Sequence, residues 1–156
     1  MSNSETPSKQ SVLILIADDD EDDQLFAREA FQENCIANKL QFVNDGVALL
    51  DYLKRRNQYA DPADSPLPGL ILLDLNMPKI DGREALKEIK ADPTLRHIPV
   101  VILTTSKAEQ DAIQMHQIGA DGFINKPVVF ADFIDLTRKL DHFWFDIVQF
   151  SNQSNP

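Results

Sequence analysis

The stretch Leu70-Ile71-Leu72-Leu73-Asp74-Leu75-Asn76-Met77-Pro78 decides the fold. Its first part is a short, uninterrupted apolar run, which predicts a strand buried on both faces of a parallel sheet. The run reaches an aspartate, and Pro78 with Asp81-Gly82 marks a loop just beyond it. A carboxylate at the end of a buried strand is costly unless another group pairs with it. The rest of the chain must therefore supply partners for Asp74.

Composition limits the classes of protein to consider. The chain has 156 residues, 43% of them hydrophobic and 26% charged, which is typical of one globular domain. It lacks a run of about 18 apolar residues, so we expect no membrane-spanning helix. A formal net charge of -10 argues against non-specific nucleic-acid binding. The single cysteine, Cys35, and a polar N-terminus without a signal sequence favour a cytoplasmic protein.

Strand and helix patterns alternate along the chain. We expect strands at 12–17, 40–43, 70–75, 98–103 and 122–125, and helices beginning near Asp20, Val47, Gly82, Ser106 and Phe130. Such alternation predicts an α/β fold, a doubly wound (βα)5 parallel sheet covered by helices, with the flavodoxin-like strand order 2-1-3-4-5. We assign residues 1–10 to a disordered tail, 11–146 to the domain, and 147–156 to a C-terminal extension that offers an interface and then becomes disordered.

Polar residues follow the predicted strands at the edge where such a sheet binds its ligands. Asp18 and Asp19 end the first strand, and Asp74, Thr104 and Lys126 end the third, fourth and fifth. Hard oxygen ligands without a cluster of His or Cys favour Mg²⁺, which commonly binds a phosphate together with one or two carboxylates. A metal, a lysine and a carboxylate nucleophile together indicate phosphoryl transfer onto an aspartate.

Each of these signals has a plainer interpretation when it is taken alone. The acidic run 20–23 is best interpreted as charges at the N-terminus of a helix. Thr104 could be an ordinary strand-end residue and Lys126 a surface lysine. The combination on neighbouring strands favours the site.

The motifs resemble those of the response-regulator receiver domain, which has the CheY-like fold. They are Ala17-Asp18-Asp19-Asp20, Leu73-Asp74-Leu75-Asn76-Met77-Pro78, Asp81-Gly82, Leu103-Thr104-Thr105 and Lys126-Pro127. The resemblance spans about residues 12–143. It implies a response regulator of a two-component phosphorelay, a signalling protein that assists its own phosphorylation and dephosphorylation and is not an enzyme in the usual sense.

The resemblance also implies roles for individual residues. Asp74 would accept the phosphoryl group from a phosphohistidine on a sensor histidine kinase or a relay phosphotransfer protein. The side chains of Asp19 and Asp74 would bind Mg²⁺, with Asp18 acting mostly through water and Asn76 through its backbone carbonyl. Thr104 would move towards the phosphoryl group and Lys126 would pair with it. The family also implies a cis peptide bond between Lys126 and Pro127, and an aromatic switch at Phe123.

Two features narrow the resemblance to the single-domain regulators that partner bacterial phytochromes and related kinases. One is the proline-rich segment 61–69, and the other is the aromatic end that begins at Phe143. The last helix needs only its inward apolar stripe to cover the sheet. The apolar residues beyond that stripe suggest an interface, such as that of a symmetric homodimer. A tail that folds back on its own domain remains the alternative. The candidate interface residues are Phe143, Trp144, Ile147 and Phe150.

Two other functions were weighed. A pseudo-receiver would bind partners without phosphorylation, although every residue required for phosphorylation is present. A phosphatase of the haloacid dehalogenase type also uses a strand-end aspartate, but it needs a second aspartate two residues later, where this chain has Asn76. Phosphorylation-dependent signalling through protein contacts is the function that the sequence favours.

Overall fold

The computed structural model of the chain describes residues 13–33, 39–63, 65–75, 77, 79, 81–104, 119–127 and 129–138. Several predictions of the sequence analysis lie outside these residues. They are the N-terminal tail, the helix expected from Ser106, the C-terminal extension, and the candidate interface at Phe143, Trp144, Ile147 and Phe150.

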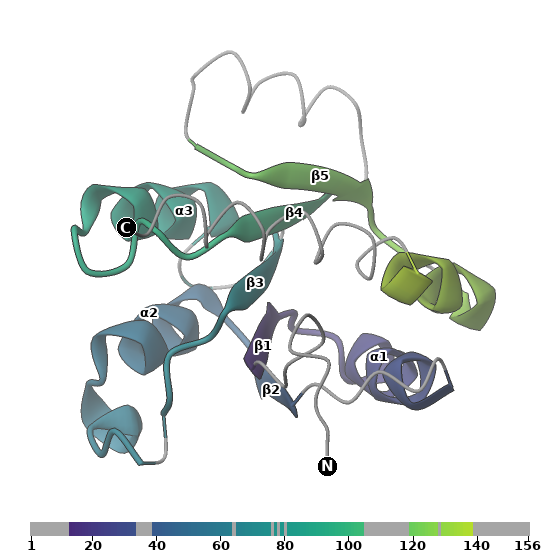
Figure 1. Cartoon of the computed structure of the whole chain (residues 1–156), viewed down its shortest axis with the longest axis horizontal. Coiled ribbons are helices and arrows are strands. Elements are labelled where there is room, and N and C mark those ends of the chain that lie inside the picture. The colour runs from purple at the N-terminus through teal and green to yellow at the C-terminus, as the bar shows by residue number, and fades with distance from the viewer. Residues whose placement is uncertain are drawn as a thin grey trace, which may run out of the picture.

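Five parallel strands form one sheet in the order β2-β1-β3-β4-β5, which confirms the predicted topology (Figure 1). The strands are β1 (Leu13–Ala17), β2 (Lys39–Val43), β3 (Leu70–Asp74), β4 (Val100–Thr104) and β5 (Gly122–Asn125). In β3, Leu72 lies opposite Ile16 of β1 on one side and Val101 of β4 on the other. β4 starts two residues later than predicted, because the Ile98 backbone N–H donates to the Leu95 carbonyl in a preceding turn.

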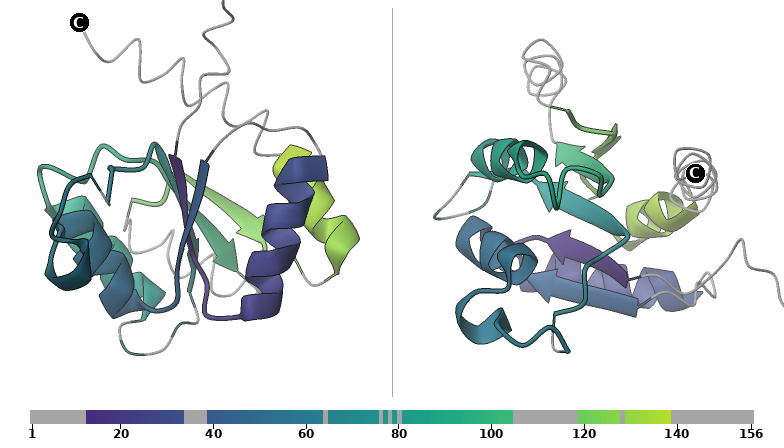
Figure 2. Two further views of the ribbon diagram at one scale, coloured as in Figure 1. Left: turned by 90° about the horizontal axis from the view of Figure 1, so that it is seen from below. Right: turned by 60° about the vertical axis from the view of Figure 1, so that its left-hand side comes forward.

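Helices cover both faces of the sheet. α1 (Glu21–Glu33) and the helical segment 130–138 lie on one face, and α2 (Gly46–Lys54) and α3 (Gly82–Ala91) lie on the other (Figures 1 and 2). Each helix begins close to the predicted place. Asp45 and Asp81 cap α2 and α3, since their side chains accept hydrogen bonds from the Ala48 and Arg83 backbone N–H groups.

The core consists of two apolar clusters, one on each face of the sheet. Consecutive side chains of a strand point to opposite faces. Ile71 and Leu73 of β3 therefore pack with α2 and α3, whereas Leu70 and Leu72 pack with α1 and segment 130–138. All four side chains are at most 1% exposed. This two-sided burial explains why β3 is a continuous apolar run rather than an alternating one.

The proline-rich segment before β3 is tied to α2 and to the short 3-10 helix η2 (Asn57–Tyr59). The Tyr52 hydroxyl donates to the Pro66 carbonyl at 2.8 Å, and its ring lies edge-on to Tyr59 with centroids 5.1 Å apart. Ser65, which is fully buried, donates its hydroxyl to the carbonyls of Tyr59 and Asp61. The segment is thus an ordered part of the domain.

One backbone prediction was wrong. None of the peptide bonds among the described residues is cis, and Lys126–Pro127 is one of these bonds. The trans form is the ordinary state of a bond before proline, favoured by about 0.5–1 kcal/mol. Among the described helices, none is long and apolar enough to cross a membrane.

We expect Tyr52→Phe to lower the free energy of unfolding by about 0.5–1.5 kcal/mol, because the hydrogen bond from the buried tyrosine to the Pro66 carbonyl is lost. Urea unfolding followed by circular dichroism measures this change. Tyr59→Phe is the matched control, since the Tyr59 hydroxyl makes no hydrogen bond within the part of the chain that the structure describes. An equal loss in both variants would contradict the assigned role of the Tyr52 hydroxyl.

The same tyrosine predicts a pH effect. Burial, aided by Tyr59, raises the pKa of Tyr52 to about 12 against the weaker opposing effect of Arg55. Below about pH 10 the residue is neutral in both the folded and the unfolded state. Above that pH only the unfolded tyrosine ionises, so the stability advantage of wild type over Tyr52→Phe should fall by about 1.4 kcal/mol per pH unit and change sign before about pH 12. A constant difference between the two proteins across this range would contradict the shift.

Candidate phosphoryl-transfer and metal site

The carboxyl ends of β1, β3 and β5 bring three of the predicted site residues together. Asp18 directly follows β1, Asp74 ends β3 and Lys126 directly follows β5. The two carboxylates are almost completely buried, at 3% and 1% exposure. They lie side by side because β1 and β3 are hydrogen-bonded neighbours in the sheet.

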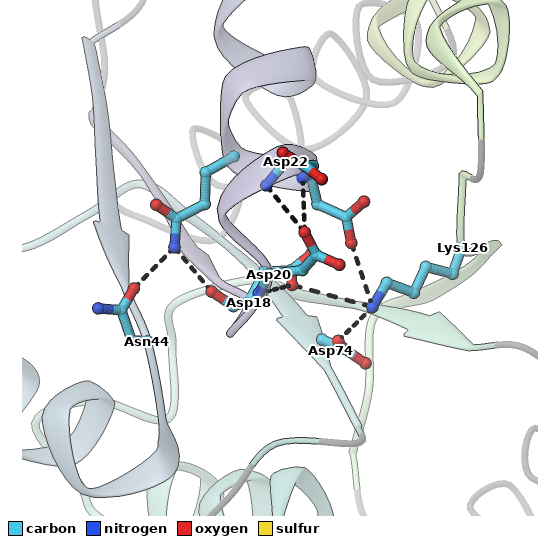
Figure 3. A network of polar contacts seen from close by, with 8 residues as sticks. Asp18, Asp20, Asp22, Asn44, Asp74 and Lys126 are labelled. Carbon is cyan, nitrogen blue, oxygen red and sulfur yellow. Dashed lines mark hydrogen bonds and ion pairs between the residues drawn. The ribbon is translucent and has the colours of Figure 1, made fainter.

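Lys126 is the cation that this buried charge needs. Its Nζ donates to Asp74 Oδ2 at 2.6 Å and lies 3.8 Å from Asp18 Oδ1 (Figure 3). A third carboxylate, that of Asp23 in the first turn of α1, has its Oδ2 3.4 Å from the same nitrogen. The lysine side chain is 19% exposed, so water only partly screens these interactions.

Asp18, Asp19 and Asp74 form a second grouping. Each offers one carboxylate oxygen, and these oxygens lie within 4.8 Å of one another. Asp19 is exposed while the other two are buried, so the group opens towards solvent on one side. Three hard oxygen ligands around an opening fit a Mg²⁺ ion, which keeps several of its waters. The residues present therefore fit the metal that the sequence predicts.

The pKa values of two groups depart from their ordinary values. Burial raises the pKa of Asp18 to about 7; the Asp20 backbone N–H and Lys126 oppose the rise, and the charges of Asp23 and Asp74 add to it. For Lys126, burial alone would lower the pKa. The hydrogen bond to Asp74 and the negative charges around the ammonium outweigh burial and raise this pKa, so the lysine is fully charged.

Backbone contacts hold Asp18 in place. Its N–H donates to the Val43 carbonyl at 3.1 Å, and its Oδ1 accepts from the Asp20 N–H at 2.9 Å. Gln24 of α1 donates to both the Asp18 carbonyl and the Asn44 side chain, which joins the ends of β1 and β2 (Figure 3). These hydrogen bonds hold the Asp18 carboxylate in the turn between β1 and α1.

Gly82 allows α3 to begin directly beside the nucleophile candidate. Its N–H donates to the Leu75 carbonyl at 3.1 Å. A Cβ at this position would lie 2.7 Å from Leu75 Cα and 2.8 Å from the Asp74 carbonyl oxygen. These neighbours are backbone atoms, so any larger residue would have to displace the end of β3.

The structure describes the remaining predicted site residues only in part. Thr104 ends β4 and pairs with Asn125 of β5, but its side chain is outside the described atoms, as is Asn76. Phe123 lies in β5, partly buried against the apolar cluster of α2 and α3. This placement agrees with a packing role and does not test a switch.

Sequence reasoning missed Asp23. It treated the whole run 20–23 as helix charges, which fits Asp20, whose side chain accepts from the Asp22 and Asp23 N–H groups and so caps α1. Asp23 differs because its side chain is only 14% exposed and faces Lys126. The available signal was its place in the first turn of a helix that follows β1 directly, since helical side chains point back towards the N-terminus.

Comparison with known proteins gives one consistent result. Residues 14–138 match the family model of the response regulator receiver domain. Response regulator Rcp1 of Synechocystis sp. is 36% identical over 148 residues, which are 95% of this chain and 97% of that protein.

Two solved structures resemble the chain throughout the fold. The phosphorylated cyanobacterial phytochrome response regulator RcpA is 35% identical with a TM-score of 0.76, over 86% of this chain and 94% of that one. The Mn²⁺-bound form of Rcp1 is 36% identical with a TM-score of 0.74 and the same coverage. Because sequence, topology and full-length similarity agree, the chain belongs to the response regulator receiver family of signalling domains.

Proposed function

We propose that this chain is a response regulator that is phosphorylated on Asp74 and signals through protein contacts. The observation that carries the proposal is the 2.6 Å hydrogen bond from Lys126 to Asp74 beside a three-carboxylate group. It supports the proposal because Asp74, the proposed nucleophile, is buried beside the lysine proposed to hold the phosphoryl oxygens and beside the carboxylates proposed to bind a divalent metal.

The proposed reaction is transfer from a phosphohistidine. A carboxylate oxygen of Asp74 attacks the phosphorus, an O–P bond forms, and the P–N bond breaks. The imidazole nitrogen keeps the electron pair and takes up a proton. Lys126 supports the reaction by neutralising charge on the transferred group, and burial of Asp74 slows attack of bulk water on the acyl phosphate.

Magnesium is the proposed cofactor, held by Asp19 and Asp74, by Asp18 mostly through water, and by the Asn76 carbonyl. When bound it supplies positive charge to the phosphoryl oxygens. The Mn²⁺-bound form of the relative Rcp1 supports a divalent cation in this family. Asp18 and Asp74 would have to release Lys126 in part to accept the metal.

Signal output is proposed to follow from a shift between two states of the domain. Thr104 would move towards the phosphoryl group, and Phe123 would respond through packing, because phenylalanine has no hydroxyl to bond. Phosphorylated RcpA, a phytochrome response regulator, supports a phytochrome-type histidine kinase as the donor. A histidine kinase that uses ATP as its phosphoryl source would act on this protein in the cytoplasm, which is the proposed location. A homodimer through the C-terminal residues remains part of the proposal.

Phosphorylation is tested by incubating the protein with Mg²⁺ and acetyl phosphate and measuring its intact mass. Wild type should gain one phosphoryl group and Asp74→Asn none, because the amide cannot form an acyl phosphate. Asp51→Asn is the control for a lost aspartate, since Asp51 lies on α2 and pairs with Arg56. EDTA should abolish the gain. Wild type that gains no mass would contradict the proposal, and a pseudo-receiver would then be the better interpretation.

Metal binding should depend on pH through Asp18. Its pKa of about 7 means that below this pH a proton must leave before the carboxylate can act as a ligand. The apparent Kd for Mg²⁺ should therefore rise about tenfold per pH unit below pH 7 and level off above it. Titration calorimetry between pH 5.5 and 8 measures this. Asp18→Asn should flatten the dependence, and a flat profile in wild type would contradict the proton-linked ligand.

A further inference from the structure

Lys126 and a divalent cation would compete for the same oxygens. Among the described residues the ammonium has three ion-pair partners, namely Asp74 at 2.6 Å, Asp23 at 3.4 Å and Asp18 at 3.8 Å. Asp18 and Asp74 also belong to the group whose oxygens lie within 4.8 Å of one another and suit a metal. A cation that binds there repels the ammonium and takes two of its three partners.

Of the partners of Lys126 that the structure describes, Asp23 alone lies outside the metal group. It sits on α1, a different element from the strand ends that carry the other two carboxylates. Its side chain is 14% exposed, whereas Glu21 and Asp22 in the same turn are exposed to solvent. A half-buried carboxylate that faces an ammonium is a stronger partner than an exposed one, because water screens the pair less.

We propose that Asp23 is a positioning residue: it is the counterion that holds Lys126 when a divalent cation occupies Asp18, Asp19 and Asp74. The inference rests on the proposed metal site. With Asp23 present, the ammonium keeps an anionic partner while it yields Asp74 to the metal. Without it, the described partners that remain to Lys126, Asp18 and Asp74, both belong to the metal group, and the cation must displace the lysine without compensation from them.

The charge balance supports this role. Asp18, Asp19 and Asp74 carry three negative charges when ionised, and Lys126 cancels one of them if it stays among them. Pairing the ammonium with Asp23 returns that charge to the metal group. Asp23 thereby raises the attraction for a divalent cation without acting as a ligand itself.

The experiment measures Mg²⁺ affinity by titration calorimetry at pH 8. Asp23→Asn should weaken Mg²⁺ binding about tenfold, which is about 1.4 kcal/mol. Asp22→Asn is the matched control, because it removes the same charge from the same helical turn, where the effect on the helix dipole is equal. It should change the affinity by about twofold or less, since exposed charges are screened. Equal effects of the two variants would overturn the proposal.

A second comparison separates a role through Lys126 from a simple charge effect. In a Lys126→Met background the ammonium no longer competes with the metal. The factor by which Asp23→Asn weakens Mg²⁺ binding should therefore be at least three times smaller in this background than in wild type. An identical effect in both backgrounds would show that Asp23 acts only as one more negative charge, and would overturn the positioning role. Asp23→Glu should restore most of the affinity.

The outcomes remain distinct from those that test the proposed function. Wild type that binds no Mg²⁺ at pH 8 refutes the metal site itself and the role of Asp23 with it. Wild type that binds Mg²⁺ and is phosphorylated on Asp74, with Asp23→Asn indistinguishable from Asp22→Asn, refutes only the role of Asp23. Circular dichroism of each variant confirms that the comparison is made between folded proteins.

Discussion

The hydrogen-bonded ion pair between Lys126 and Asp74 is the interaction on which the rest of the site depends. Asp74 is 1% exposed, and a carboxylate that is so completely removed from water needs a counterion within hydrogen-bond distance. Losing one partner of a buried pair typically costs about 3–5 kcal/mol, a large share of the stability of a small domain. The pair also fixes geometry, because it joins the end of β3 to the residue after β5 across the intervening strand β4. The sheet order is therefore a requirement of the site as well as a property of the core.

The packing of the core supports the buried ion pair between Lys126 and Asp74. β3 places apolar side chains on both faces of the sheet, Leu70 and Leu72 on one and Ile71 and Leu73 on the other, so the strand is held firmly up to its last residue. At that end α3 begins at once, and Gly82 lets its first turn approach the Asp74 carbonyl closely. Burial drives the carboxylate into a region of low dielectric, where each nearby charge has a larger effect than it would at the surface. The same packing that stabilises the fold thus strengthens the electrostatics of the site.

Sequence reasoning recovered the strand order, both faces of the core and the meeting of Asp18, Asp19, Asp74 and Lys126. Short-range sequence patterns predict these features, namely apolar runs, turn residues and polar residues at strand ends. Parallel topology then brings the strand-end residues to one edge of the sheet. It failed where the answer depends on a contact between distant elements. Asp23 looked like an ordinary helix charge, because its separation from Lys126 in sequence gives no hint that the two meet. The start of β4 was misplaced for a local reason, since Ile98 is apolar and buried but belongs to a turn.

The cluster of carboxylates at the strand ends lowers the stability of the fold. A fold selected only for stability would not place Asp18 and Asp74 beside each other, since the charge of Asp74 adds to burial in raising the pKa of Asp18. A single lysine, even with a raised pKa, cannot neutralise Asp18, Asp23 and Asp74 at once. A bound divalent cation would relieve this excess negative charge, so part of the cost of placing the carboxylates together would return as binding energy for the metal. Because Lys126 directly follows β5 and Asp23 lies on α1, their ion pairs connect the end of β3 to elements on either side of the sheet centre.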